Sequence, residues 1–110
     1  MSRPGPSGPV LVRRARDRVH KFEAVFSDGA PRVVRFGRQG YSDYTKHHDA
    51  KRKSRYIVRH QRRENWGRSG SRTAGFWSRW LLWSKPSFKA ALAQTQKVLG
   101  RKILFKRSGR

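Results

Sequence analysis

Apolar residues at every second position mark the first half of the chain as strand-forming. Phe22, Ala24 and Phe26 lie two residues apart in one run, and residues 32–36 form a second run rich in valine. Residues 27–31, between the two runs, contain Asp, Gly and Pro, which is typical of a turn. Two extended runs joined by a short glycine-containing turn predict an antiparallel β-hairpin.

The next segment has the composition of a helix with one narrow apolar stripe. Thr45 or Asp49 is a suitable N-cap for a helix from about residue 49 to residue 65. The apolar residues of this helix are few, so we expect most of its circumference to face solvent. Before it, residues 37–44 contain two glycines and no helical period, which predicts a structured loop.

Two further helices are expected in the second half of the chain. Thr73 is a suitable N-cap for residues 74–83, whose apolar side chains cover most of a helix and predict a buried or docked segment. Pro86 ends that helix. Apolar residues then recur at helical spacing over residues 88–99, and Gly100 occupies the position that favours a left-handed residue after the last turn.

These elements predict an α+β fold, with an N-terminal β-hairpin followed by about three helices and with flexible basic termini. Residues 10–16 are expected to add a short strand or an ordered tail, and residues 103–105 a last strand. A single domain is expected over residues 10–105. Residues 1–9, rich in Pro and Gly, are expected to form a flexible arm, and residues 106–110 a basic tail.

The charge of the chain changes this picture most. Twenty-eight Lys and Arg residues face six Asp and Glu residues, which gives a formal net charge of +22, and no acid follows Glu64. Self-repulsion of that size opposes a compact state unless a polyanion or an acidic protein surface offsets it. The absence of cysteine excludes disulfides, thiolate zinc sites and thiol catalysis. No apolar run reaches the roughly 18 residues of a membrane span, and no secretory signal is evident.

The basic residues of the predicted 49–65 helix are the first candidate site. The simplest interpretation is that these residues form a solvent-exposed face of an ordinary domain and have no binding role. Only Lys53 and His60 have an acidic residue four positions away in the sequence, so we do not expect a helix covered by salt bridges. We favour a face that binds a polyanion or an acidic partner. The expected polyanion-binding residues are Arg38, Lys51, Arg52, Arg55, Arg59, Arg62 and Arg63.

Large aromatic residues form the second candidate set. All four tryptophans follow Asn65, and they either build the core or form a docking or base-stacking surface. Helical spacing and the neighbouring leucines favour the core. Tyr41 and Tyr44, in the glycine loop, are better placed for stacking, although such tyrosines often anchor a loop by packing. The core or docking aromatics are Trp66, Phe76, Trp77, Trp80 and Trp83.

Metal binding and catalysis have little support in the sequence. His47, His48, Asp49 and His60 resemble only loosely the histidine pattern of a ββα nuclease, so neither a metal ion nor another cofactor is expected. The carboxylates are scattered, and no nucleophile or P-loop motif is present. Residues 37–40 match the G-x-x-G of a phosphate-clamping loop, but a turn that needs positive φ is the better interpretation.

Several blocks between residues 34 and 93 are distinctive in composition. They include GYSDYT at residues 40–45, RENW at residues 63–66, TAGFWSRWLLW at residues 73–83 and KPS at residues 85–87. In these blocks the chain resembles a family of small basic proteins of nucleocytoplasmic large DNA viruses. The resemblance implies a viral origin. It carries no reaction or site across.

Charge and resemblance together predict a non-catalytic structural protein of a virion, either a minor capsid protein or an inner-shell component. Its basic surface would contact acidic capsid proteins, anionic membrane head groups or packaged DNA within a large assembly. The expected location is the virion or its inner face, and otherwise inside the cell without secretion. The first alternative is a sequence-nonspecific nucleic-acid-binding protein that condenses DNA or joins a ribonucleoprotein. The second is a metal-dependent nuclease.

Overall fold

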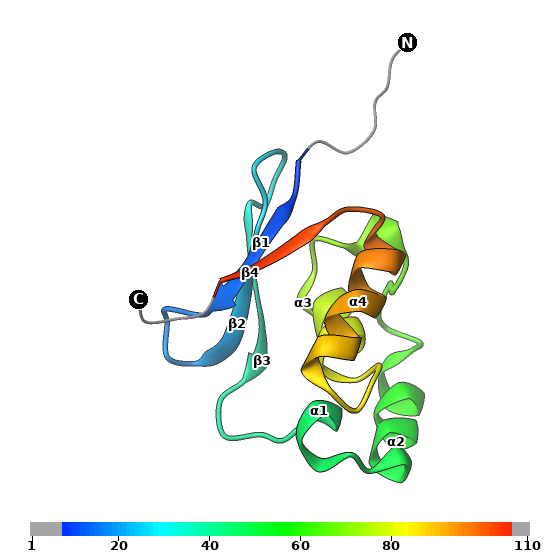
Figure 1. Cartoon of the computed structure of the whole chain (residues 1–110). Coiled ribbons are helices and arrows are strands. Elements are labelled where there is room, and N and C mark those ends of the chain that lie inside the picture. The colour runs from blue at the N-terminus through cyan, green and yellow to red at the C-terminus, as the bar shows by residue number, and fades with distance from the viewer. Residues whose placement is uncertain (1–7, 107–110) are drawn as a thin grey trace.

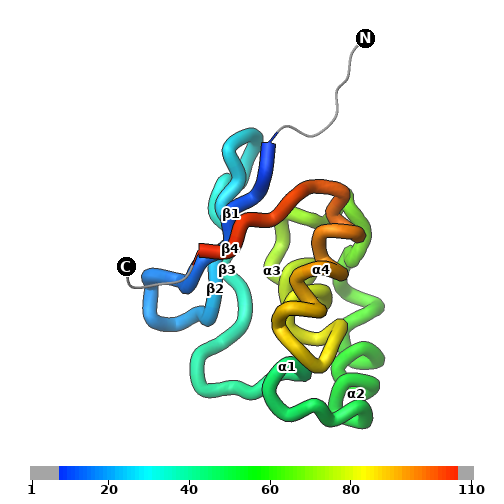
Figure 2. The backbone as a smooth tube through the Cα atoms, in the orientation of Figure 1, coloured from blue at the N-terminus to red at the C-terminus, as the bar shows by residue number. Residues whose placement is uncertain are grey.

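The computed structural model describes residues 8–106 and contains one four-stranded sheet with helices packed on one of its faces (Figure 1). The strand order is β3-β2-β1-β4, and the strands are β1 (Val10–Arg14), β2 (His20–Val25), β3 (Val33–Arg38) and β4 (Ile103–Lys106). β1 and β2 are antiparallel, as are β2 and β3. β4 runs parallel to β1, so the first and last described strands lie side by side (Figure 2).

The helices follow β3 and precede β4. They are α1 (Tyr44–His47), α2 (Ala50–His60), the 3₁₀ turn η1 (Arg68–Gly70), α3 (Ala74–Trp77), the π-helical turn η2 (Ser78–Leu82) and α4 (Phe88–Leu99). Each α-helix begins at a side-chain cap that accepts backbone N–H groups, and the caps are Asp43, Asp49, Thr73 and Ser87. These caps and the strands confirm the predicted α+β fold class.

The predicted hairpin is confirmed as β2 and β3, and strand register explains why it packs. Phe22 pairs with Phe36 and Ala24 pairs with Val34, so alternate apolar residues of both strands share one face. The turn is held from outside the hairpin, because the Arg72 guanidinium donates to a turn carbonyl at 2.8 Å and lies 4.0 Å from the Phe26 ring centroid.

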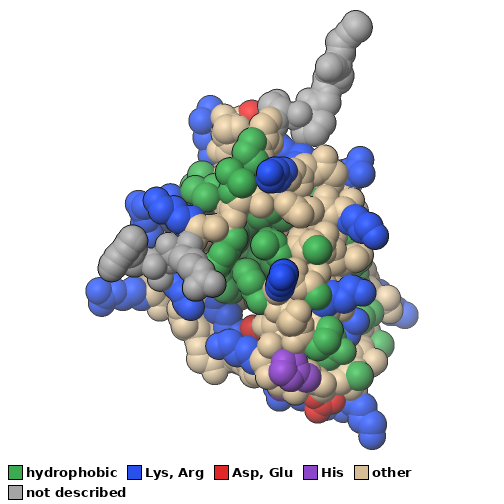
Figure 3. Space-filling model, in the orientation of Figure 1, with side chains coloured by type: hydrophobic (Ala, Val, Ile, Leu, Met, Phe, Trp, Pro, Cys, Tyr) green, Lys and Arg blue, Asp and Glu red, His purple; other side chains and the backbone are tan. Residues whose placement is uncertain are grey.

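The outer surface is strongly basic. In Figure 3, Lys and Arg side chains surround a patch of hydrophobic side chains near β1 and β4. Among residues 8–106, no helix is long and apolar enough to cross a membrane.

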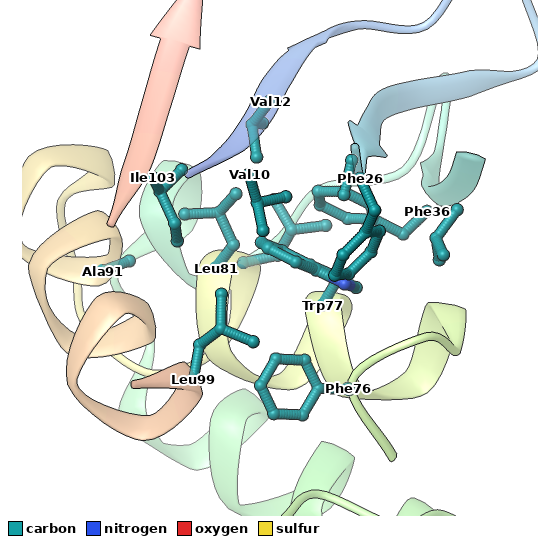
Figure 4. Close-up of a cluster of buried hydrophobic side chains, with 13 residues drawn as sticks. Val10, Val12, Phe26, Phe36, Phe76, Trp77, Leu81, Ala91, Leu99 and Ile103 are labelled. Atoms are coloured by element: carbon teal, nitrogen blue, oxygen red, sulfur yellow. The ribbon is translucent and has the colours of Figure 1, made fainter. Parts of the chain in front are cut away.

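The core lies between the sheet and the segment from α3 to α4 (Figure 4). Trp77 is fully buried, and its ring stacks on Phe36 at a centroid distance of 5.7 Å and meets Phe26 edge-on at 6.2 Å. Leu81, from the following turn, is also fully buried. Large aromatic rings therefore pack with Val, Leu and Ile side chains from the sheet and the helices to fill a small core.

Two helices differ from the sequence-based expectations. The basic helix ends at His60, not at residue 65, and Glu64, beyond the helix, bonds the His60 ring. The expected helix over residues 74–83 begins at Ala74 but widens after Trp77, where the Trp83 N–H donates to the Ser78 carbonyl five residues back.

The short helix α1 was not expected, since residues 37–44 were interpreted as a loop. It begins because Asp43 accepts the backbone N–H of Thr45, and it ends at His48, which has a left-handed φ of 56°. Residues 37–40 do form the expected glycine turn, because Gly37 and Gly40 both have positive φ.

The expected terminal segments fall mostly outside the described residues, which exclude 1–7 and 107–110. Of the expected arm, Gly8 uses its carbonyl to accept hydrogen bonds from Arg101. Of the expected tail, Lys106 is the last residue of β4. The strand expected at residues 103–105 is confirmed, and so is the one expected at residues 10–16.

Candidate polyanion-binding surface

α2 touches the rest of the domain along a single edge. Asp49 caps its first turn by accepting the N–H groups of Lys51 and Arg52, and this bonding lowers the Asp49 pKa. Tyr56 is the one buried residue of α2, at 6% exposed. The narrow apolar stripe in the sequence therefore buries one ring and leaves the remaining surface to charged side chains.

The buried edge is an aromatic stack. The Tyr56 ring lies 4.5 Å from the Trp83 ring at an interplanar angle of 6°, and the His60 ring lies 4.3 Å away on α2 itself. Burial raises the pKa of the Tyr56 hydroxyl, so it stays neutral. Lys53 adds a hydrogen bond, which its Nζ donates to the Ser84 carbonyl at 2.9 Å. These contacts hold α2 against Trp83 and Ser84.

The expected polyanion-binding residues of α2 and of the turn that follows it are all exposed. Val58 lies among them and is 66% exposed, which shows how completely this side of the helix faces solvent. Among the described residues, none of these cations has a salt bridge with a carboxylate. They are Lys51, Arg52, Arg55, Arg59, Arg62 and Arg63, called the α2 cations below.

The acids of the sheet are occupied by other cations. Glu23 is 1% exposed and accepts from Arg13 at 2.7 Å and from Arg35 at 3.1 Å. Burial by itself would raise the Glu23 pKa, but these two guanidinium groups outweigh burial and hold it below the usual value. Asp28 is shared between Arg72 and Arg101.

The remaining acids are used in loops and caps. Asp43 pairs with the buried Lys21 at 2.6 Å, and Asp17 bonds His20 at the same distance. Glu64 accepts from the Trp66 indole at 2.9 Å and bonds the His60 ring at 2.8 Å. Asp49 accepts the backbone N–H groups of Lys51 and Arg52, so each of the six acids has a local partner, and among the described residues none forms a salt bridge with an α2 cation.

Arg38, the other expected polyanion-binding residue, is exposed at the end of β3. It shares a hollow of about 330 Å³ with Tyr41 of the glycine loop and with His60 of α2. The fold therefore brings Arg38 to the C-terminal half of α2, although more than ten residues separate them in sequence. Tyr41 is 67% exposed and does not anchor its loop by packing, so it stays available for stacking.

The expected core or docking aromatics divide into two groups. Phe76 and Trp77 are fully buried in the core. Trp66, Trp80 and Trp83 are half-buried and form the support beneath α2. The Trp80 indole N–H donates to the Trp66 carbonyl at 2.8 Å, so its polar edge is satisfied within the domain.

Arg79 is the cation that supports these rings. Its guanidinium lies 4.4 Å from the Trp80 ring centroid and 5.2 Å from that of Trp66, and it donates to the Trp83 carbonyl at 3.2 Å. Burial lowers its pKa. Arg79 thus acts as a packing element beneath α2, and not as part of the exposed basic surface.

The histidines are dispersed. His47 accepts the Asp49 N–H at Nδ1, His20 pairs with Asp17, and His60 pairs with Glu64. Among residues 8–106, no group of three His, Cys, Asp or Glu residues is arranged to hold a metal ion.

A second hollow, of about 470 Å³, was missed in the sequence. It opens between the sheet and the helices α1 and α4. Its lining residues are Arg14, Lys21, Phe22, Gln39, Asp43, Thr45, Lys46, Phe88 and Phe105. The alternation of side chains along β1 could have predicted part of this lining, because Arg14 lies on the same face as Val10 and Val12 and pairs with Phe22.

Fold and surface together define a small basic α+β domain with an exposed cationic helix. Residues 10–60, which extend from β1 to the end of α2, are similar to a family of unknown function (DUF5754). No curated protein and no solved structure matches the chain.

Proposed function

We propose that this protein is a non-catalytic nucleic-acid-binding component of a larger assembly, and that the α2 cations bind the phosphate backbone without sequence preference. One observation carries the proposal. The α2 cations are exposed on one helix and the turn after it, and none of them forms a salt bridge with a carboxylate of the described residues. Their charge therefore needs a counterion from outside the domain.

The dimensions of α2 suit a phosphate backbone. A helix of 11 residues is about 16 Å long at a rise of roughly 1.5 Å per residue. One strand of duplex DNA places a phosphate about every 3.4 Å along the axis, so about five phosphates lie along that length. Lys51, Arg52, Arg55 and Arg59 lie within that length, and Arg62, Arg63 and Arg38 can reach phosphates beyond it. Arg and Lys contacts to phosphate position a protein without reading sequence.

The resemblance to proteins of large DNA viruses supplies the biological setting of the proposal. We infer that the protein works in the virion, where packaged DNA or the inner face of the capsid would offer the polyanion. An acidic capsid protein and an anionic membrane offer similar charge, and the binding experiment separates them from nucleic acid.

The experiment is a salt titration of binding to a 20-base-pair duplex of mixed sequence, repeated with a second sequence. If about six to eight phosphates are neutralised, log K falls against log salt with a slope of roughly −5 to −7. Both sequences should bind alike. A duplex that fails to bind at low salt, beside an acidic protein or anionic vesicle that binds, overturns the nucleic-acid proposal.

A matched pair of triple variants locates the surface. Arg52→Gln, Arg55→Gln and Arg59→Gln together should reduce the magnitude of the slope by about 2 to 3. Lys89→Gln, Lys97→Gln and Lys102→Gln remove the same charge from exposed positions on and after α4 and should have a smaller effect. Equal effects of the two triples would assign binding to net charge and not to α2.

A further inference from the structure

The hollow between the sheet and the helices α1 and α4 combines an aromatic floor with a cationic rim. Phe22 from β2, Phe88 from α4 and Phe105 from β4 form the floor. The Phe88 and Phe105 ring centroids are 4.9 Å apart, and Phe22 stacks on Phe88 at 5.4 Å. All three rings are half-buried, so each keeps a part of its surface open to the hollow.

The rim is positively charged. Arg14 and Lys46 line the hollow from opposite elements, β1 and α1, and both are exposed. Neither forms a salt bridge with a carboxylate of the described residues. The one acid in the lining, Asp43, is neutralised by the buried Lys21 at 2.6 Å. The net character of the opening is therefore cationic.

We propose that this hollow binds an unpaired base of single-stranded nucleic acid, with the base ring on the phenylalanine floor and the flanking phosphates on Arg14 and Lys46. An aromatic floor favours a flat ring that stacks on it. The cations of the rim, on either side of that ring, favour a ligand with an anionic group on each side. A hollow of about 470 Å³ lies within the range of ordinary ligand sites, about 300–1,000 Å³. A base in a duplex reaches it only after unpairing, which costs a few kcal/mol.

The position of the hollow connects it to the α2 cations. Lys46 lies on α1, and α2 begins at Ala50, three residues after the last residue of α1. Figure 1 places α1 between the sheet and α2. A strand that leaves the hollow over Lys46 therefore meets the first α2 cations, Lys51 and Arg52. This inference rests on the proposed function and adds to it a preference for single strands.

The test compares fluorescein-labelled dT12 with a labelled 12-base-pair duplex at equal salt. The key variant is Phe88→Leu, which keeps an apolar residue in the α4 packing and removes the flat ring. It should weaken dT12 binding by about fivefold or more and change duplex binding by less than about twofold. Arg14→Gln should also weaken dT12 binding more than duplex binding.

Two control variants match these changes in residues that do not line the hollow. Leu104→Ala truncates an exposed apolar side chain next to Phe105, and Lys89→Gln removes an exposed cation next to Phe88. Both should leave the ratio of dT12 to duplex affinity unchanged. Thermal unfolding of each variant checks that the fold is kept.

A cross-linking measurement on the unmodified protein gives an answer that needs no variant. Irradiation with dT12 carrying one 5-iodouracil should join the oligonucleotide to peptides that contain Phe22, Phe88 or Phe105. Cross-links confined to Tyr41, or displacement of dT12 by laurate at equal concentration, would overturn the base site. The second result would assign the hollow to an aliphatic chain.

The two proposals fail in different ways. If neither dT12 nor the duplex binds, the proposed function is wrong. If both bind with equal affinity and Phe88→Leu changes neither, the α2 cations bind backbone and the base site is wrong.

Discussion

Tyr56 lies flat against Trp83, with ring centroids 4.5 Å apart and an interplanar angle of 6°. Tyr56 is the buried residue of the cationic helix, and Trp83 follows directly after η2, the turn that fills the core. One ring pair thus joins the most charged element of the described chain to its most apolar segment. The cationic surface depends on this contact for its position.

Removing the Tyr56 ring should detach α2 while the sheet stays folded. Tyr56→Ala is expected to cost about 3–5 kcal/mol, the range for loss of a large buried ring. Amide hydrogen exchange should show α2 losing protection before β1 and β2 do. Tyr56→Phe keeps the stack and is the control, with an expected change below about 1 kcal/mol. Uniform loss of protection across sheet and helix would show that α2 is not a separate unit.

The tryptophans should differ in their contribution to stability according to burial. Trp77→Ala, at the fully buried position, is expected to lower the free energy of unfolding by about 3–5 kcal/mol. Trp80→Ala should cost less, because the ring is half-buried, and Arg55→Ala should stay within about 0.5 kcal/mol. Urea unfolding gives all three values. A Trp80 variant with unchanged stability but weakened DNA binding would assign that ring to the binding surface.

Acidification should destabilise the protein through His47. Its Nδ1 accepts the Asp49 N–H at 2.9 Å, so the ring is neutral when folded, and burial first and Arg52 second lower its pKa below the usual value of about 6.5. The unfolded chain therefore takes up the proton first as pH falls. Stability due to His47 is fully present above pH of about 6.5 and is lost below it.

Urea midpoints at pH 7.5 and pH 5.5 measure this effect. His47→Asn keeps an acceptor and does not titrate, so it should lose less stability than the unmodified protein over the same interval. The other histidines are the same in both proteins, so the difference between the two losses of stability reports His47. Equal losses would show that protonation of His47 does not oppose folding.

The buried pair of Lys21 and Asp43 should behave as a unit. Asp43→Asn leaves the Lys21 ammonium buried without a counter-charge, which is expected to cost about 3–5 kcal/mol. Lys21→Met with Asp43→Asn removes both charges and should recover most of that loss. Asn can still accept the Thr45 N–H that Asp43 caps, so a double variant no more stable than Asp43→Asn alone would show that the unpaired Lys21 charge is not the source of the cost.

The parts of the fold that local sequence determines were predictable. Phe22, Ala24 and Phe26 gave the hairpin, and Thr73 gave the start of α3, because alternation and caps act over a few residues. The exposure of the α2 cations follows in the same way from a helix with one apolar edge. Gly100, with φ of 76°, ends α4 as expected.

What could not be predicted depends on residues far apart in sequence. The parallel pairing of β4 with β1 brings Ile103 beside Val10, and no local pattern specifies that register. The same pairing brings Phe105 to Phe22 and so creates the hollow with the phenylalanine floor. The π-helical turn at Ser78 was also missed, because helical spacing does not reveal the i→i+5 bond from the Trp83 N–H to the Ser78 carbonyl.

The parallel pairing of β1 with β4 has a mechanical consequence. Because the two strands run in the same direction, the start of β1 and the end of β4 lie at opposite ends of the pair. A pull on the chain from both sides would slide the strands past each other and load their hydrogen bonds together, not one after another as in peeling. The pair of β1 and β4 would thus be the part of the sheet that resists a force applied along the chain.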